Sequence, residues 1–135
     1  MRVDATELAE LRGQNDIVLV RQLVRRRAVE LGLSLVDQTK LVTAASELAR
    51  NTVEYGGGGT LAVEVLESES GRRGLRLTFE DEGPGIPDVA LALSDGYTTG
   101  SGMGLGLGGA RRLVNEFDIS SEPGRGTRVT VTRWR

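Results

Sequence analysis

The chain has 135 residues, of which 39% are hydrophobic and 27% charged, and this composition predicts one globular domain over residues 1–135. Its formal net charge of −2 argues against a nucleic-acid or anionic-membrane partner, and the absence of a transmembrane-length or signal-type apolar segment predicts a cytoplasmic protein. The lack of cysteine and histidine excludes disulfides, thiol chemistry, a histidine base, a phosphohistidine and most zinc sites.

The N-terminal half is predicted to contain two amphipathic helices. Residues 6–12 precede them and alternate too weakly to distinguish a first strand from a short helix. The first helix begins with Asn15 or Asp16 as its N-cap and stops at Gly32. Its apolar stripe consists of Ile17, Val20, Val24, Ala28 and Leu31. The second helix covers residues 34–55 and ends at the four glycines 56–59. Its stripe consists of Leu41, Ala45, Leu48 and Thr52.

The C-terminal half is predicted to add two hairpins and a third helix. Residues 60–67 and 74–80 alternate with period two around a polar turn, and "DEGPGIPD" at 81–88 cannot continue the strand because of its Gly and Pro content. A glycine-rich stretch follows, then a helix from about Gly104 to Phe117 and a hairpin of 117–122 with 127–134. This order predicts an α+β fold, a two-layer sandwich of one mainly antiparallel sheet covered on one face by three helices.

The glycine-rich stretch 96–109 fits neither of the two common phosphate loops. Gly104, Gly106 and Gly109 match G-x-G-x-x-G, but turn residues rather than a strand precede them and too little chain follows for a dinucleotide-binding domain. A Walker A loop needs a lysine after its last glycine, and the single lysine is Lys40. No Lys or Arg lies between residues 77 and 110, so a phosphate there would depend on backbone amides, hydroxyls and a metal.

Two further segments carry polar groups in patterns that suit a ligand site. Glu47 and Asn51 are spaced i, i+4 and project from one helix face, where they could orient a hydroxyl and hold Mg²⁺, or simply form a solvated pair. Asp81 directly follows a strand, and Gly83 and Gly85 would let a flat ring lie close to it. A plain Asp-Gly turn is the alternative there, as a glycine hinge is for the stretch at 96–109.

These three segments, in this order, resemble the motifs of the GHKL ATPase superfamily. "SELARN" at 46–51, "DEGPGI" at 81–86 and "GMGLGLGG" at 102–109 resemble its N, G1 and G2 boxes, and "GRGT" at 124–127 resembles its fourth element. The resemblance implies a Bergerat-type fold that binds ATP and Mg²⁺, with Glu47 as general base and Asn51 as the metal ligand. It also implies that Asp81 reads the adenine amine above a floor of Gly83, Gly85 and Ile86. The other implied ATP contacts are Thr98, Gly102, Met103, Gly104, Leu105, Gly106, Gly108 and Thr127.

Within the superfamily, the short chain without histidine is similar to the small free-standing serine/threonine kinases. "RNT" after the glutamate and the following Tyr55 favour the stressosome switch kinases over the anti-sigma-factor kinases, which usually have "TNA" and a histidine. The resemblance implies a kinase that phosphorylates a STAS-domain scaffold or antagonist protein and then binds the regulatory domain of a serine phosphatase. Two alternatives stay open. One is an anti-sigma-factor kinase that sequesters a sigma factor, and the other is a non-catalytic adaptor that activates the phosphatase.

Overall fold

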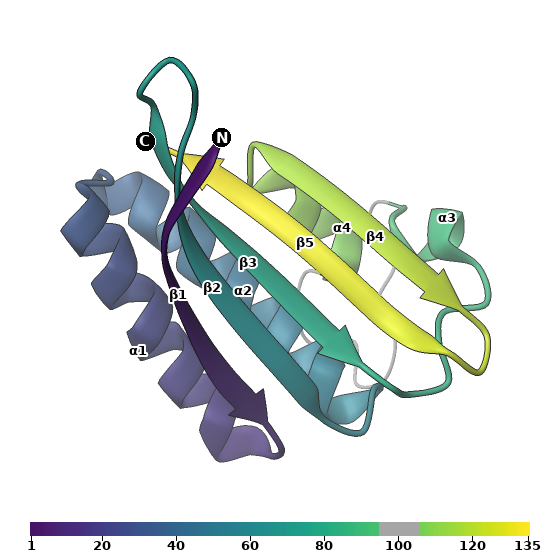
Figure 1. Ribbon diagram of the computed structural model, residues 1–135. Coiled ribbons are helices and arrows are strands. Elements are labelled where there is room, and N and C mark those ends of the chain that lie inside the picture. The colour runs from purple at the N-terminus through teal and green to yellow at the C-terminus, as the bar shows by residue number, and fades with distance from the viewer. Residues whose placement is uncertain (95–105) are drawn as a thin grey trace.

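The computed structural model describes residues 1–94 and 106–135, in which helices back one antiparallel sheet (Figure 1). The strands are β1 Arg2–Leu11, β2 Gly59–Glu67, β3 Arg73–Asp81, β4 Glu116–Glu122 and β5 Gly126–Trp134. The described helices are α1 Gln14–Leu31, α2 Leu35–Glu54, α3 Val89–Ala92 and α4 Gly106–Arg112. The strand order β1-β2-β3-β5-β4 is antiparallel throughout. The predicted α+β sandwich is confirmed, and the one-turn helix α3 adds to the three expected helices.

The core lies between the sheet and the two long helices, α1 and α2, which lie against the same face of the sheet (Figure 1). All nine residues of the two predicted stripes are buried, which confirms the expected orientation of both helices. They meet inward-facing strand residues such as Val63, Leu77 and Phe79, whose burial supplies most of the driving force for this packing. No described helix is both long enough and apolar enough to cross a membrane.

The first helix begins earlier than the sequence predicts. Its N-cap is Gly13 rather than Asn15 or Asp16, and the helix starts at Gln14. The Asp16 carboxylate, at the third helical position, accepts hydrogen bonds from the amides of Arg12 at 2.8 Å and Gly13 at 3.2 Å. Asp16 therefore stabilises the helix start from inside the first turn. The predicted N-cap, Asn15 or Asp16, lies two or three positions after the observed one.

Strand β1 explains why residues 6–12 alternate weakly. It is an edge strand with a register shift between Val3 and Ala5, and one of its inward positions is occupied by Glu7. That carboxylate accepts hydrogen bonds from Arg26 and Arg27 of α1 at 2.9–3.1 Å. A charged residue that faces the helix layer breaks the apolar alternation, although the segment is a strand.

The last helix is shorter than predicted. It ends at Arg112, and Phe117 lies in β4 opposite Val131 of β5. The chain turns at Asn115, whose amide donates to the Thr132 carbonyl at 2.9 Å and whose side-chain oxygen accepts from the Trp134 amide at 2.7 Å. These two bonds join the turn to β5, so Phe117 follows the two-residue period of a strand.

Candidate functional site

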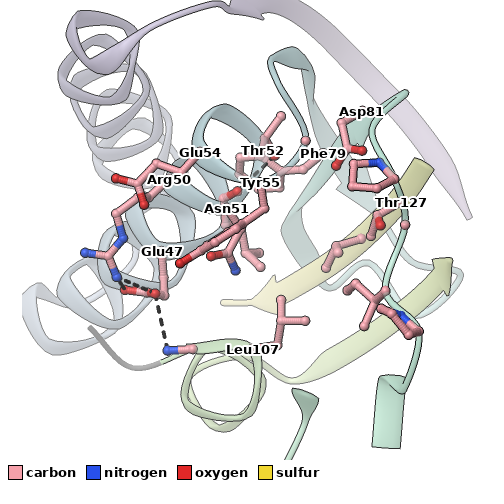
Figure 2. Close-up of a pocket in the computed structure, with 18 of the residues that line it drawn as sticks. Glu47, Arg50, Asn51, Thr52, Glu54, Tyr55, Phe79, Asp81, Leu107 and Thr127 are labelled. Atoms are coloured by element: carbon pink, nitrogen blue, oxygen red, sulfur yellow. Dashed lines mark hydrogen bonds and ion pairs between the residues drawn. The ribbon is translucent and has the colours of Figure 1, made fainter. Parts of the chain in front are cut away.

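A cavity of about 380 Å³ opens between α2, the end of β3, the segment 84–91, β5 and the start of α4 (Figure 2). This volume is in the range of small-molecule sites. Residues from all three predicted motifs line it, although the outermost of these, Glu47 and Leu107, are 60 positions apart along the chain. The predicted site residues that line the cavity are Glu47, Asn51, Asp81, Gly85, Ile86, Gly106 and Thr127.

Helix α2 contributes Glu47 and Asn51 to one side of the cavity, and the adjacent buried stripe that includes Leu48 packs against the core and so fixes the rotation of the helix. Glu47 is only 8% exposed. Both of its carboxylate oxygens accept hydrogen bonds of 2.5 Å from Arg50, and one also accepts from the Gly106 amide at 3.2 Å (Figure 2). Glu47 therefore connects α2 to the first residue of α4.

Asp81 lies at the other end of the cavity, across from Glu47 in the close-up (Figure 2). It is the last residue of β3, and it pairs with Thr127 of β5. Burial raises the pKa of its carboxyl above the ordinary value, and hydrogen bonds from the Gly83 and Thr127 amides offset part of that rise. A half-buried carboxylate beside the apolar side chain of Phe79 suits a hydrogen bond to the edge of a flat, polar ring.

The chain passes very close to Asp81 at two glycines. A Cβ atom at Gly56 would lie 2.5 Å from the Cβ of Asp81, and one at Gly83 would lie 2.7 Å from the Cα of Gly56. Real side chains do not approach this closely, so both positions require glycine. The two glycines therefore let the end of α2 and the segment after β3 pack directly against each other beside the Asp81 carboxylate.

Ser121 of β4 organises the floor of the cavity, and the sequence reasoning did not identify it. Its hydroxyl accepts a hydrogen bond from the Ile86 amide at 2.8 Å and lies 2.7 Å from the Thr127 hydroxyl. Gly85 has a left-handed φ of 78°, and a Cβ there would lie 2.7 Å from the carbonyl carbon of Glu122. Ser121 thus holds Ile86 beside Thr127. In the sequence, the only feature that could have indicated Ser121 was its place in the last hairpin, close to Thr127.

The glycine-rich stretch is described only from Gly106 onward. Thr98, Gly102, Met103, Gly104 and Leu105 lie outside the described residues, so their expected contacts stay predictions. Gly106 lines the cavity, whereas Gly108 is buried where a Cβ would meet the carbonyls of Leu93 and Ser94. Gly83 also lies outside the lining, and its amide donates to Asp81 at 2.9 Å.

The cavity is acidic, and Arg50 is the only described residue with a cationic side chain that lines it. Its acidic lining residues are Glu47, Glu54, Asp81 and Asp88. Among residues 1–94 and 106–135, no three His, Cys, Asp or Glu side chains gather into a metal site. Mg²⁺ commonly uses few protein ligands and several phosphate oxygens and waters, so the Asn51 side-chain oxygen fits a metal that arrives with a nucleotide.

Comparisons with known proteins identify the family of this chain. The family "Histidine kinase-, DNA gyrase B-, and HSP90-like ATPase" matches residues 36–134. The serine/threonine-protein kinase RsbT of Bacillus subtilis is 45% identical over 88% of this chain and 89% of its own. An anti-sigma F factor of Thermoanaerobacter is 24% identical over 98% and 96% of the two chains. A crystal structure of RsbU and RsbW domains from Mycobacterium tuberculosis superimposes with a TM-score of 0.65 at 24% identity, over 97% of this chain and 33% of that longer one.

Proposed function

Because the chain belongs to the histidine kinase-, DNA gyrase B- and HSP90-like ATPases and is an RsbT-like serine/threonine-protein kinase, we propose that it phosphorylates a STAS-domain protein. The substrate would be a scaffold or antagonist, and the kinase would act in the cytoplasm. The observation that carries the proposal is that Glu47, Asn51 and Asp81 line a single cavity. Glu47 is the candidate general base, Asn51 the candidate metal ligand, and Asp81 the candidate group that recognises adenine.

The residues take complementary roles in this mechanism. When bound, Mg²⁺-ATP supplies the phosphoryl group and the metal neutralises part of its charge. Asp81 accepts a hydrogen bond from the exocyclic amine of adenine, and Ile86 and Phe79 contact the ring. Asn51 contributes its side-chain oxygen to the metal. Glu47 accepts the proton of the substrate hydroxyl as the hydroxyl oxygen attacks the terminal phosphorus. In this mechanism most of the rate enhancement derives from positioning of the reactants and neutralisation of charge.

We further propose that the kinase exchanges partners. After phosphorylation of the STAS protein it would release that protein and bind the regulatory domain of a serine phosphatase. The two partners would compete for the surface around the cavity, so regulation would depend on which partner is bound. This proposal rests on the similarity to RsbT, which is 45% identical to this chain over most of the length of both proteins.

A second function deserves a test because of a specific observation. An anti-sigma F factor is similar to nearly the whole chain, at 24% identity over 98% of it. In that alternative the chain would phosphorylate an antagonist and also bind a sigma factor directly. The two functions share the ATP site and differ in the partner that is retained.

The experiment is a reconstitution with proteins encoded in the same genome. The purified chain is incubated with labelled Mg²⁺-ATP and each STAS-domain protein, and then used as bait for the serine phosphatase and the sigma factors. We expect label on a Ser or Thr of a STAS protein and capture of the phosphatase. Stable capture of a sigma factor without the phosphatase would support the anti-sigma alternative. Phosphatase activation by a Glu47→Gln variant, with no STAS protein labelled by the wild type, would indicate a non-catalytic adaptor.

A further inference from the structure

Arg50 occupies a distinctive place in the cavity. It lies on α2 between Glu47 and Asn51, one turn after the first and directly before the second, and it lines the cavity with both (Figure 2). Its side chain is 29% exposed, so the guanidinium is not locked in the core. Its contacts within the described residues are the two short hydrogen bonds from Nη2 to Glu47.

Arg50 has hydrogen-bond donors that its contacts with Glu47 do not use. An arginine side chain carries five N–H donors in a fixed planar fork. Only Nη2 is used in the described part of the chain, which leaves Nε and Nη1 without a protein acceptor there. A planar fork of this kind matches two oxygens of a phosphate group, which binds a guanidinium in bidentate fashion.

The charge of the cavity makes this arginine important. Four carboxylates line the cavity against this one cation, and the stretch from residue 77 to residue 110 contains neither Lys nor Arg. A nucleoside triphosphate brings several negative charges, of which one Mg²⁺ offsets two. Within the described lining, Arg50 is the side chain that can offset a further charge.

Resting on the function proposed above, we propose that Arg50 is a phosphate-binding residue that moves from Glu47 to the terminal phosphate when ATP binds. The Glu47 carboxylate holds the guanidinium in the state described by the structure. The phosphate group carries more negative charge than one carboxylate and offers two oxygens to the free donors, so it competes for the fork. Transfer of Arg50 leaves the Glu47 carboxylate available to accept a hydrogen bond from the substrate hydroxyl.

This exchange predicts selectivity for ATP over ADP. The terminal phosphate is present only in ATP, so a residue that binds it affects the two nucleotides differently. A residue that only stabilises α2 affects them equally. Glu47 and the phosphate compete for Arg50, so removal of the Glu47 charge strengthens ATP binding as long as Arg50 is present.

The test is calorimetric titration of ATP and ADP, each with Mg²⁺, into the wild type, Arg50→Gln, Arg50→Lys, Glu47→Gln and the double variant. We expect Arg50→Gln to weaken ATP by about tenfold or more and ADP by less than about twofold, as for loss of a charge-assisted hydrogen bond. Arg50→Lys, which keeps the charge without the fork, falls between. Glu47→Gln strengthens ATP by about two- to fivefold, the size of a partly exposed ion pair, and the double variant loses this gain.

Controls separate the inference from the function on which it rests. Arg21→Gln removes the same charge from an exposed position on α1 that does not line the cavity, and it should bind both nucleotides normally. Thermal unfolding identifies a misfolded variant, and Arg50→Lys then carries the test. Equal changes for ATP and ADP, or no change, would overturn the role of Arg50 alone. A wild-type chain that binds neither nucleotide would overturn the proposed function itself.

Discussion

Gly56, the second residue after α2, lies directly against Asp81, the last residue of β3, and no atom fits between the two backbones and the carboxylate. A Cβ at Gly56 would lie 2.5 Å from the Cβ of Asp81 and 2.6 Å from its Oδ2. The end of α2 therefore limits the positions open to the carboxylate, which also accepts hydrogen bonds from the Gly83 and Thr127 amides. The predicted metal ligand and the predicted base-reading group are coupled through this contact, because Asn51 lies in the last turn of α2.

Gly56→Ala is expected to disturb the fold and the site together. The added methyl group must displace Asp81 or the end of α2, and overpacking of this kind typically costs about 1–3 kcal/mol. We expect a lower midpoint of thermal unfolding and weaker ATP binding in calorimetry. Gly13→Ala is the control for ATP affinity, since a Cβ there meets nothing within 4 Å and Gly13 does not line the cavity. Normal ATP affinity in a stable Gly56→Ala protein would contradict the coupling.

Asp81→Asn is expected to weaken ATP binding by about tenfold or more, because a charge-assisted hydrogen bond to the adenine amine contributes about 1.5–3 kcal/mol. The side chain keeps its size, so circular dichroism should show an unchanged fold. GTP should bind poorly to the wild type, since guanine presents an acceptor where adenine has a donor. Calorimetry with ATP and GTP measures both effects, and unchanged ATP affinity in the variant would remove Asp81 from the site.

The same substitution is expected to alter how stability depends on pH. Because burial raises the pKa of Asp81 in the folded state, the folded protein binds this proton more tightly than the unfolded chain does. The contribution of Asp81 to stability is therefore present below the unfolded-state pKa of about 4 and is lost as pH rises through the folded-state value. Asp81→Asn lacks this loss, so its unfolding midpoint should improve relative to the wild type as pH rises from 4 to 8. A constant difference across that range would contradict the assignment.

Glu47→Gln is expected to separate binding from chemistry. The variant keeps the shape of the side chain, so Mg²⁺-ATP binding should persist with at most the modest gain argued above. It cannot accept the hydroxyl proton, and phosphoryl transfer to the STAS substrate should fall by about 10²-fold or more. Single-turnover transfer from labelled ATP measures this step. A normal rate would show that another group, or solvent, takes the proton.

Asn51→Ala is expected to remove the metal dependence of nucleotide binding. If the Asn51 side-chain oxygen ligates Mg²⁺, wild-type affinity for ATP should be much higher with Mg²⁺ than with a chelator, and the variant should bind equally weakly in both. Titrations of the two proteins under the two conditions give a direct comparison. Asn51→Asp, which retains an oxygen ligand, should keep part of the effect.

The layers of the fold could be predicted because their signals are local and repeated. The stripe from Ile17 to Leu31 follows the helical period over four turns, and the strands at 60–67 and 74–80 alternate cleanly. The prediction for residues 104–117 was wrong at its C-terminal end, since Phe117 fits a helix stripe until its pairing with Val131 is known. The pairing of β4 with β5 determines where the helix ends, and a local sequence pattern does not reveal such long-range pairing.

The site was predictable only where its residues carry a motif. Glu47, Asn51 and Asp81 occur in recognisable sequence contexts, and the structure brings all three to one cavity. Ser121 lies outside these motifs, and Arg50 lies within "SELARN" but was assigned no role there. The role of Ser121 depends on the approach of Ile86 and Thr127 from other segments. Arg50 looks like an ordinary exposed helix cation until the cavity around it is known to contain four carboxylates.

The place of β5 in the sheet has a consequence for how the protein is made. Strand β5, which follows β4 along the chain, is inserted between β3 and β4, and it carries Thr127 and Val129 of the cavity. A nascent chain that has emerged only as far as β4 exposes one edge of β3 and lacks these two lining residues of the cavity. Such an edge invites pairing with another chain, and it stays open until β5 has been synthesised and pairs with β3. The cavity is therefore completed in one step that follows the synthesis of β4, when β5 pairs with β3.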